Sequence, residues 1–278
     1  MTTAPLTHRD LGIHPGILGQ ILEAGNVAWP CGVCRDCHDR ANSQELPGGP
    51  LAWGYGRTRI AFHAFEPVRG NQAALELGVG ALLAEHPHSD VSFTLHRTAV
   101  VGDASITSVS FGDCMGGEEG CGLGNTGPSG NMTRVNATTL DAWALAWRIP
   151  VVDILVIDAE GFEPDIFAGS LQLFRSGKVR LFVFEYGGRW PLGSNSTLQR
   201  EVATFDSLGY DCYLLQRSLV IRLTGCWVPA MESYYWSNVL CTLRTEVLLH
   251  ETVERFTPSR QGGRGLQRSI IPKMPMRL

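Results

Sequence analysis

The fold of this chain is decided by the stretch Val152-Asp153-Ile154-Leu155-Val156-Ile157-Asp158-Ala159-Glu160-Gly161-Phe162-Glu163-Pro164-Asp165. Its first six residues are almost all apolar and rich in Val and Ile, which is typical of a strand buried on both faces of a parallel sheet. Glu163-Pro164-Asp165 then opens a helix, because Pro fits a first-turn position and acids favour the positive end of the helix dipole. Ligands of open α/β sheets bind at the carboxyl ends of the strands. Asp158 and Glu160 are therefore candidate site residues, and the alternative is that they only cap the helix.

Strands and helices alternate on both sides of this stretch, which indicates an α/β fold. The helix after the first strand is expected to turn Ala74, Leu77, Ala81 and Leu82 toward the sheet. We predict strands at 60–65, 91–101, 152–157, 179–184, 212–215 and 237–243, an edge strand within 105–111, and helices at 71–84, 138–147, 164–176 and 197–208.

Three regions differ in pattern. Residues 1–58 show no clear order, residues 59–250 form the α/β domain, and residues 251–278 read as a disordered tail rich in Gly, Arg and Pro. The first region contains Cys31, Cys34, Cys37 and His38, which could bind zinc. Four ligands in one tight turn are difficult to arrange as a tetrahedron, so we favour reduced surface thiols over a metal site.

Glu66 closes the predicted strand at 60–65 and precedes Pro67. A carboxylate in this position commonly binds the two ribose hydroxyls of an adenosine cofactor, because it accepts both hydroxyl protons. An acid that merely caps the next helix would explain the residue equally well. Farther on, Gly122–Gly127 matches the dinucleotide pattern G-x-G-x-x-G, but it lacks the strand and helix that give this pattern meaning. We interpret it as a flexible loop, which leaves a nicotinamide-dependent oxidoreductase as a distant alternative.

Composition limits the possible partners and compartments. The 278 residues are 44% hydrophobic, enough for a sizeable core. A net charge of −4 gives no electrostatic support for a nucleic-acid or membrane-surface partner, and no apolar run approaches the roughly 20 residues of a membrane span. The first residues lack a secretory signal pattern, so we expect a cytoplasmic protein with its eight cysteines reduced. Asn131, Asn136 and Asn195 form sequons, which would point to the secretory pathway if the natural N-terminus lay upstream.

Four motifs follow one another along the α/β domain: Ala64-Phe65-Glu66-Pro67 with Asn71, Thr139-Leu140-Asp141, Asp153–Glu163 and Phe184-Glu185-Tyr186. In these motifs and in its order of elements, the chain resembles the FkbM family of S-adenosylmethionine-dependent methyltransferases over roughly residues 59–245. The resemblance implies a class I methyltransferase (Rossmann-like) fold, a three-layer sandwich with a mostly parallel sheet and an antiparallel last strand. It also implies S-adenosylmethionine as the cofactor and methyl transfer to an oxygen of a sugar or small metabolite, so that the partner is a small-molecule or glycan acceptor.

The resemblance also implies roles for individual residues. Glu66, with Asn71 behind it, is the cofactor's ribose acid, and Asp103 lies near the adenine. Asp158 and Glu160 are the active-site acids. Either one could take the proton of a hydroxyl acceptor or lie against the cationic part of the cofactor, and both alternatives stay open. This chemistry requires no metal.

The sequence departs from the family pattern in two places. Val156 stands where the family usually carries a Lys. Residues 30–58 contain no match to the glycine-rich cofactor loop that follows the family's first strand. The sequence is therefore compatible both with a sheet that contains this strand and with one that lacks it. The alternative function is therefore a non-catalytic, truncated or degenerate domain on the same scaffold that acts as a binding module.

Overall fold

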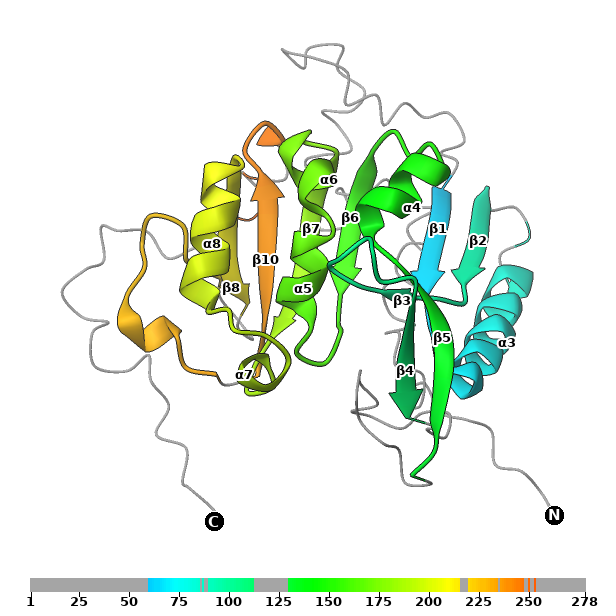
Figure 1. Cartoon of the computed structure of the whole chain (residues 1–278). Coiled ribbons are helices and arrows are strands. Elements are labelled where there is room, and N and C mark those ends of the chain that lie inside the picture. Colours follow the sequence, from blue (N-terminus) through cyan, green and yellow to red (C-terminus); the bar gives the residue numbers. More distant parts are fainter. Residues whose placement is uncertain are drawn as a thin grey trace, which may run out of the picture. The chain divides into compact units, whose positions relative to one another are not determined.

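The computed structural model describes residues 60–85, 87, 90–112, 130–215, 220–234, 236–247, 250 and 253. The chain divides into two compact units, the first ending at Ala137 and the second formed by Val101–Ile106 and the chain from Thr138 on (Figure 1). The cysteine cluster at 31–38, the glycine pattern at 122–127 and the tail from 254 on lie outside the described residues, so these predictions remain untested.

The first unit begins with a parallel strand pair joined by a helix. Strand β1 (Ile60–Phe65) pairs in register with β2 (Val91–His96), and helix α3 (Arg69–Glu85) connects them. The predicted inward face of α3 is confirmed only in part: Leu82 packs against buried Val79, whereas Leu77 is 74% exposed and Leu75 is buried in its place. Apolar side chains lie on more than one side of this helix, so spacing alone does not identify the buried side.

A small sheet completes the first unit. It has the order β3-β5-β4, with β3 at Ala99–Val100, β4 at Ser108–Gly112 and β5 at Met132–Thr138. Its core contains Ala99 and Phe111 together with Val68. The single strand predicted at 91–101 is therefore two strands in different sheets, and β5 lies in a stretch where the sequence predicted no strand.

The second unit contains a five-stranded sheet of order β6-β7-β10-β8-β9. Strand β10 runs antiparallel to both β7 and β8, and β8 and β9 are also antiparallel. The α/β class is confirmed, but a mostly parallel sheet is not what this unit shows, because only β6 and β7 pair in parallel. The strands are β6 (Val152–Ile157), β7 (Val179–Tyr186), β8 (Tyr210–Leu215), β9 (Val220–Arg222) and β10 (Ser237–Leu243).

Helices pack on one face of this sheet around an aromatic core. Thr139 and Thr197 cap α4 and α8 through their side chains. The helix predicted at 164–176 is broken in two, because Gly169 lies against the Val101 carbonyl, which a β-carbon at 169 would approach to 2.4 Å. The helices are α4 (Leu140–Ala146), α5 (Glu163–Ala168), α6 (Leu171–Arg175), α7 (Trp190–Gly193), α8 (Leu198–Ser207) and the 3-10 turn η2 (Pro229–Met231), and the core rings are Phe167, Phe174, Phe182, Phe184 and Phe205.

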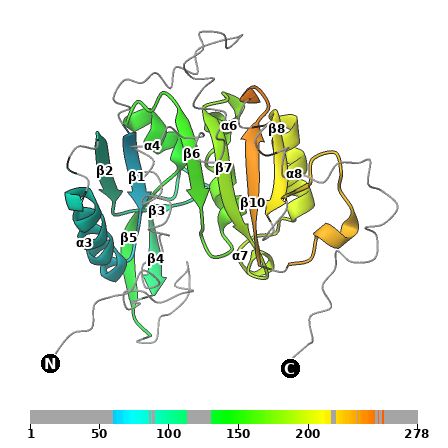
Figure 2. The same cartoon turned by 180° about the vertical axis from the view of Figure 1, so that it is seen from behind.

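Strand β6 is not buried on both faces, contrary to prediction. Within the described residues it is an edge strand that pairs only with β7 (Figure 2). Ile154 and Val156 are 44% and 49% exposed, and they share a face with Leu181 and Val183 rather than with the aromatic core. The apolar run therefore identified the strand correctly but overestimated its burial.

Two cysteines form a disulfide, which corrects the expectation that all of them are reduced. Cys212 in β8 and Cys241 in β10 lie directly opposite each other, with their α-carbons 4.1 Å apart, and both are fully buried. Among the described residues, no helix has the length and apolar character that crossing a bilayer requires.

Candidate functional site

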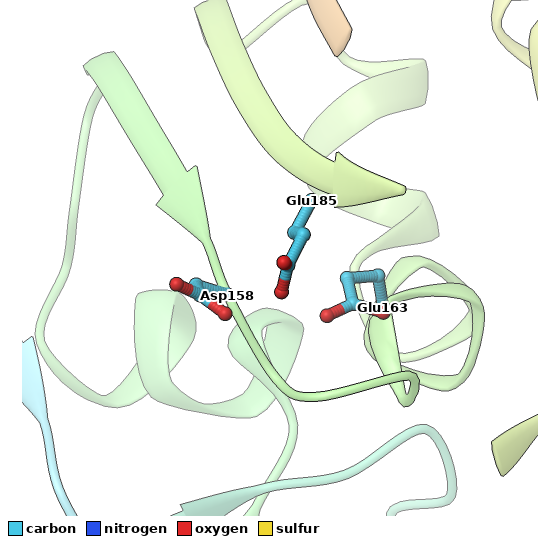
Figure 3. Close-up of side chains that lie close together, drawn as sticks. All are labelled: Asp158, Glu163 and Glu185. Atoms are coloured by element: carbon cyan, nitrogen blue, oxygen red, sulfur yellow. The ribbon is translucent and has the colours of Figure 1, made fainter. Parts of the chain in front are cut away.

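Three carboxylates from three elements of the second unit converge at one end of its sheet. Asp158 directly follows β6, Glu185 lies near the end of β7, and Glu163 is in the first turn of α5 (Figure 3). Each contributes an oxygen to a group whose members all lie within 4.8 Å of one another. Because β6 and β7 run in parallel, their carboxyl ends meet at the same edge of the sheet and bring these acids together.

Glu163 is the most deeply buried of the three acids, with only 1% exposed. Its carboxylate accepts a hydrogen bond from the Ala159 amide at 2.7 Å and from the Gly161 amide at 3.1 Å. Burial raises the pKa of Glu163, while these backbone hydrogen bonds oppose the shift. The acid thus faces back across the loop that joins β6 to α5.

That loop has an unusual backbone. Glu160 and Gly161 both have positive φ, at 55° and 103°. Gly161 also lies so close to Arg189 that a β-carbon would come within 2.7 Å of the Arg189 carbonyl oxygen. The turn after β6 therefore requires glycine for both its conformation and its close contact.

Glu185 carries the largest carboxyl pKa shift of this cluster. Burial, a hydrogen bond with Asp158 and the charges of Asp158, Glu160 and Glu163 raise its pKa to about 8. At neutral pH, Glu185 therefore holds a proton and donates it in the hydrogen bond to Asp158.

Glu160 has a different environment from Asp158. Its carboxylate forms an ion pair with Arg189, and both side chains are partly exposed. The guanidinium neutralises Glu160, whereas the neighbour of Asp158 is another acid. The two acids predicted for the site are therefore distinct: one is bound to a cation and the other to a protonated carboxyl.

A cavity of about 210 Å³ opens beside Glu185. Trp236 forms part of its wall and is 73% exposed, whereas Trp190 is 1% exposed and donates its indole N–H to the Glu185 carbonyl at 3.1 Å. An exposed aromatic ring next to carboxyl groups is a common arrangement in small-molecule sites. The lining residues are Gly161, Glu163, Glu185, Gly187, Gly188, Arg189, Trp190 and Trp236.

Buried contacts hold the wall that carries Trp236. The Tyr186 hydroxyl donates to Glu232 at 2.9 Å and accepts the Tyr234 amide at 3.1 Å. Glu232 also accepts the Leu198 amide at 2.9 Å, in the first turn of α8. Strand β7 thereby fixes both the acid at its own end and the segment that leads to Trp236.

The three clustered acids also offer oxygen ligands for a cation. Hard divalent cations prefer six or more oxygens, and the described residues add no fourth His, Cys, Asp or Glu to the group. The cluster alone therefore defines no metal site.

The methyltransferase FkbM domain family matches residues 54–212, more than half of the chain. The chain belongs to the FkbM family. The matched region runs from just before β1 into β8 and contains all four acids of the loop and cavity. No functionally characterised protein matched the chain.

The remaining site residues predicted from the FkbM resemblance have clear local structures. In the first unit, Glu66 accepts the Val68 amide at 2.7 Å and the Asn71 side-chain amide at 3.3 Å, and burial raises its pKa. In the second unit, Asp103 is exposed and accepts the Ser105 amide at 2.8 Å, which lowers its pKa. The structure thus joins Glu66 to Asn71 and Asp158 to the acid cluster.

Sequence reasoning assigned no role to Glu163 or Glu185 in the site. Glu185 carried a usable signal, because it follows an apolar strand as Glu66 and Asp158 do. Glu163 carried none, because a Glu before Pro at a helix start normally faces solvent and the helix dipole. Its burial is a property of the folded loop.

Proposed function

We propose that this FkbM-family protein is an S-adenosylmethionine-dependent methyltransferase that methylates a hydroxyl oxygen of a sugar or small metabolite. The observation that carries the proposal is the convergence of Asp158 and Glu185 beside a cavity with an aromatic wall, where the pKa of Glu185 is raised to about 8. A class I fold is part of the proposal. Each unit by itself has features that suit it: a parallel β1–β2 pair in the first, and antiparallel β10 beside the parallel pair β6–β7 in the second.

The proposed chemistry needs a base. A hydroxyl group is a weak nucleophile until a group within hydrogen-bond reach takes its proton. Asp158 suits this role because its carboxyl group accepts the hydrogen bond of the protonated Glu185, which holds it in place. Glu160 suits it less, because its carboxylate is already bound to Arg189. Asp158 would take the proton of the acceptor hydroxyl, while a bound cofactor would supply the methyl group, whose bond to sulfur breaks as the bond to the acceptor oxygen forms, and would leave as the neutral thioether.

The residues present fit the proposed cofactor, which would supply a methyl group on a positively charged sulfur. Each carboxylate oxygen of Glu66 accepts one hydrogen bond from the protein and retains a lone pair for a ribose hydroxyl. Asn71 orients that carboxylate, and Asp103 is assigned to the adenine on the family pattern. The carboxyl group of Asp158 would also favour a nearby positive charge.

The cavity suits a polyol acceptor. The face of Trp236 can pack against the C–H groups of a sugar ring while its hydroxyl groups donate to carboxylate oxygens. The same acids repel phosphate groups, which argues against a nucleic-acid acceptor. The compartment predicted from the sequence is the cytoplasm, but the Cys212–Cys241 disulfide favours the alternative, the secretory pathway.

Calorimetric titration with S-adenosylhomocysteine tests the enzyme hypothesis. We expect micromolar binding by the wild-type chain and, with a panel of free sugars and glycans, a mass increase of one methyl group in one of them. Asp158→Asn should retain binding and lose at least 100-fold in transfer rate, because it removes the base.

Absence of binding at millimolar cofactor would instead support the second candidate, a non-catalytic binding module. The sequence favours that candidate at one point, since residues 30–58 contain no match to the family's glycine-rich loop. Glycan binding without cofactor binding would be its positive result.

A further inference from the structure

The backbone between β6 and α5 is held from inside by one side chain. Glu163 Oε1 accepts the Ala159 amide at 2.7 Å and Oε2 accepts the Gly161 amide at 3.1 Å, so that one carboxylate spans both ends of a three-residue segment. The residue between these amides is Glu160, in a left-handed conformation that non-glycine residues rarely adopt. A conformation of this kind persists only when its surroundings enforce it.

We propose that Glu163 is a positioning residue whose buried carboxylate fixes the backbone of residues 158–161 and thereby places Asp158 beside Glu185 and Glu160 beside Arg189. The hydrogen bonds from the Ala159 and Gly161 amides to Glu163 form a clamp on the loop backbone. Its role in catalysis rests on the proposed function, whereas the clamp itself does not. A second contact restrains the same loop, because Gly161 packs against the Arg189 backbone without room for a β-carbon.

Only a glutamate satisfies all of these contacts at this position. Aspartate is one methylene shorter and would withdraw the carboxylate from the two amides. Glutamine has one carbonyl oxygen, so its amide N–H₂ would face one of the backbone N–H groups that Glu163 now satisfies. The two substitutions therefore break the clamp by different routes, and only glutamine also removes the charge.

The charge of Glu163 gives a second, electrostatic readout. The charged and titratable groups around Glu185 are Asp158 and Glu160 from the loop, Glu163 from α5, and Arg189, which lines the same cavity. Removal of the negative charge at 163 should lower the pKa of Glu185, because one of the neighbours that disfavour its ionisation is lost. A purely structural role for Glu163 would leave that titration unchanged.

The test compares the wild-type full chain with Glu163→Gln, Glu163→Asp and the control Glu201→Gln. Glu201 is also a buried glutamate of the second unit, but it lies in α8 and contacts Ser196. Amide hydrogen exchange by NMR should accelerate at least tenfold at Ala159 and Gly161 in both Glu163 variants and not in the control. Carboxyl carbon chemical shifts should show a lower titration midpoint for Glu185 in Glu163→Gln and a retained one in Glu163→Asp.

Binding of S-adenosylhomocysteine separates the clamp from the proposed function. If exchange accelerates but not even the wild-type chain binds the cofactor product, the clamp stands and the enzyme proposal fails. Unchanged exchange at Ala159 and Gly161 in both Glu163 variants would overturn the clamp, whatever the cofactor result. If Glu163→Gln does not fold, Glu163→Asp alone decides, because it keeps the charge and shortens only the reach.

Discussion

Each unit contains a Glu-Pro turn in which a glutamate carboxylate accepts a backbone amide at 2.7 Å: Glu66 from Val68 and Glu163 from Ala159. Burial raises the pKa of both acids. Their neighbours differ, because Glu66 has the neutral amide of Asn71 beside it, whereas Glu163 has Asp158 and Glu185. The turn at Glu66 therefore presents a single carboxylate, which suits hydroxyl groups as ligands. The turn at Glu163 brings three carboxyl groups so close together that Glu185 holds a proton at neutral pH, which suits proton transfer.

The largest effect is expected from Gly161→Ala in the turn at Glu163. The new methyl group would meet the Arg189 backbone at 2.7 Å in a residue with φ of 103°. We expect a loss of about 3 kcal/mol in the free energy of unfolding, from strain and overpacking together. Urea denaturation measures it.

Gly209→Ala provides the matched control, because Gly209 also has a positive φ, 89°, but nothing lies within 4 Å of its added carbon. Its cost should be about 1 kcal/mol, from backbone conformation alone. Equal losses in the two variants would mean that the contact with Arg189 contributes nothing.

Glu185→Gln tests whether the Glu185 carboxyl group holds a proton at neutral pH. The folded pKa of Glu185 is about 8 and its unfolded value is 4.5, so the folded state binds more protons between these values. Stability should therefore fall as pH rises from about 5 to 8, by roughly 1–2 kcal/mol after allowance for solvent screening. Glu185→Gln should flatten this part of the profile.

Thermal denaturation between pH 5 and 9 measures the difference. Glu76→Gln serves as the control, because Glu76 is an exposed residue of α3 that forms an ion pair with Arg97. If stability fell equally steeply with pH in wild type and in Glu185→Gln, Glu185 would not hold the proton that we predict.

These two turns also show what the sequence could predict. The β6 strand was predicted with its observed bounds, Val152–Ile157, and Asp158 and Glu160 were placed correctly at its carboxyl end, because an apolar run followed by acids is a local signal. The exposure of Val156 was not predictable in the same way. It depends on which elements cover that face of the sheet, and no short stretch encodes that.

The roles of Glu163 and Glu185 escaped prediction for a related reason. The raised pKa of Glu185 requires carboxyl groups from a loop, a helix and a second strand to converge, and the distances between them are set by the sheet register. The Cys212–Cys241 disulfide depends on register as well, since the two residues are far apart in sequence but opposite each other in β8 and β10. Composition and periodicity contain no information on register between distant strands.

Glu66→Ala tests the turn at Glu66 in the first unit. We expect the affinity for S-adenosylhomocysteine to fall about tenfold, or roughly 1.4 kcal/mol, because two ribose hydroxyl groups would lose a charged acceptor. Calorimetry measures the change, with Glu76→Ala as a control in the same unit. An unchanged affinity would limit Glu66 to the hydrogen bonds of its own turn.

The smallest effect is expected from Gly80→Ala, and it has the opposite sign. Gly80 lies inside α3, has no positive φ, and nothing lies within 4 Å of an added β-carbon. Alanine there should stabilise the first unit by about 0.5–1 kcal/mol, since it restricts the unfolded chain and favours the helix. Hydrogen exchange of the α3 amides measures this gain within the unit that contains Glu66. Compared with Gly161→Ala, the result would show that a glycine in the first unit is dispensable, whereas the glycine beside the acids is required by its surroundings.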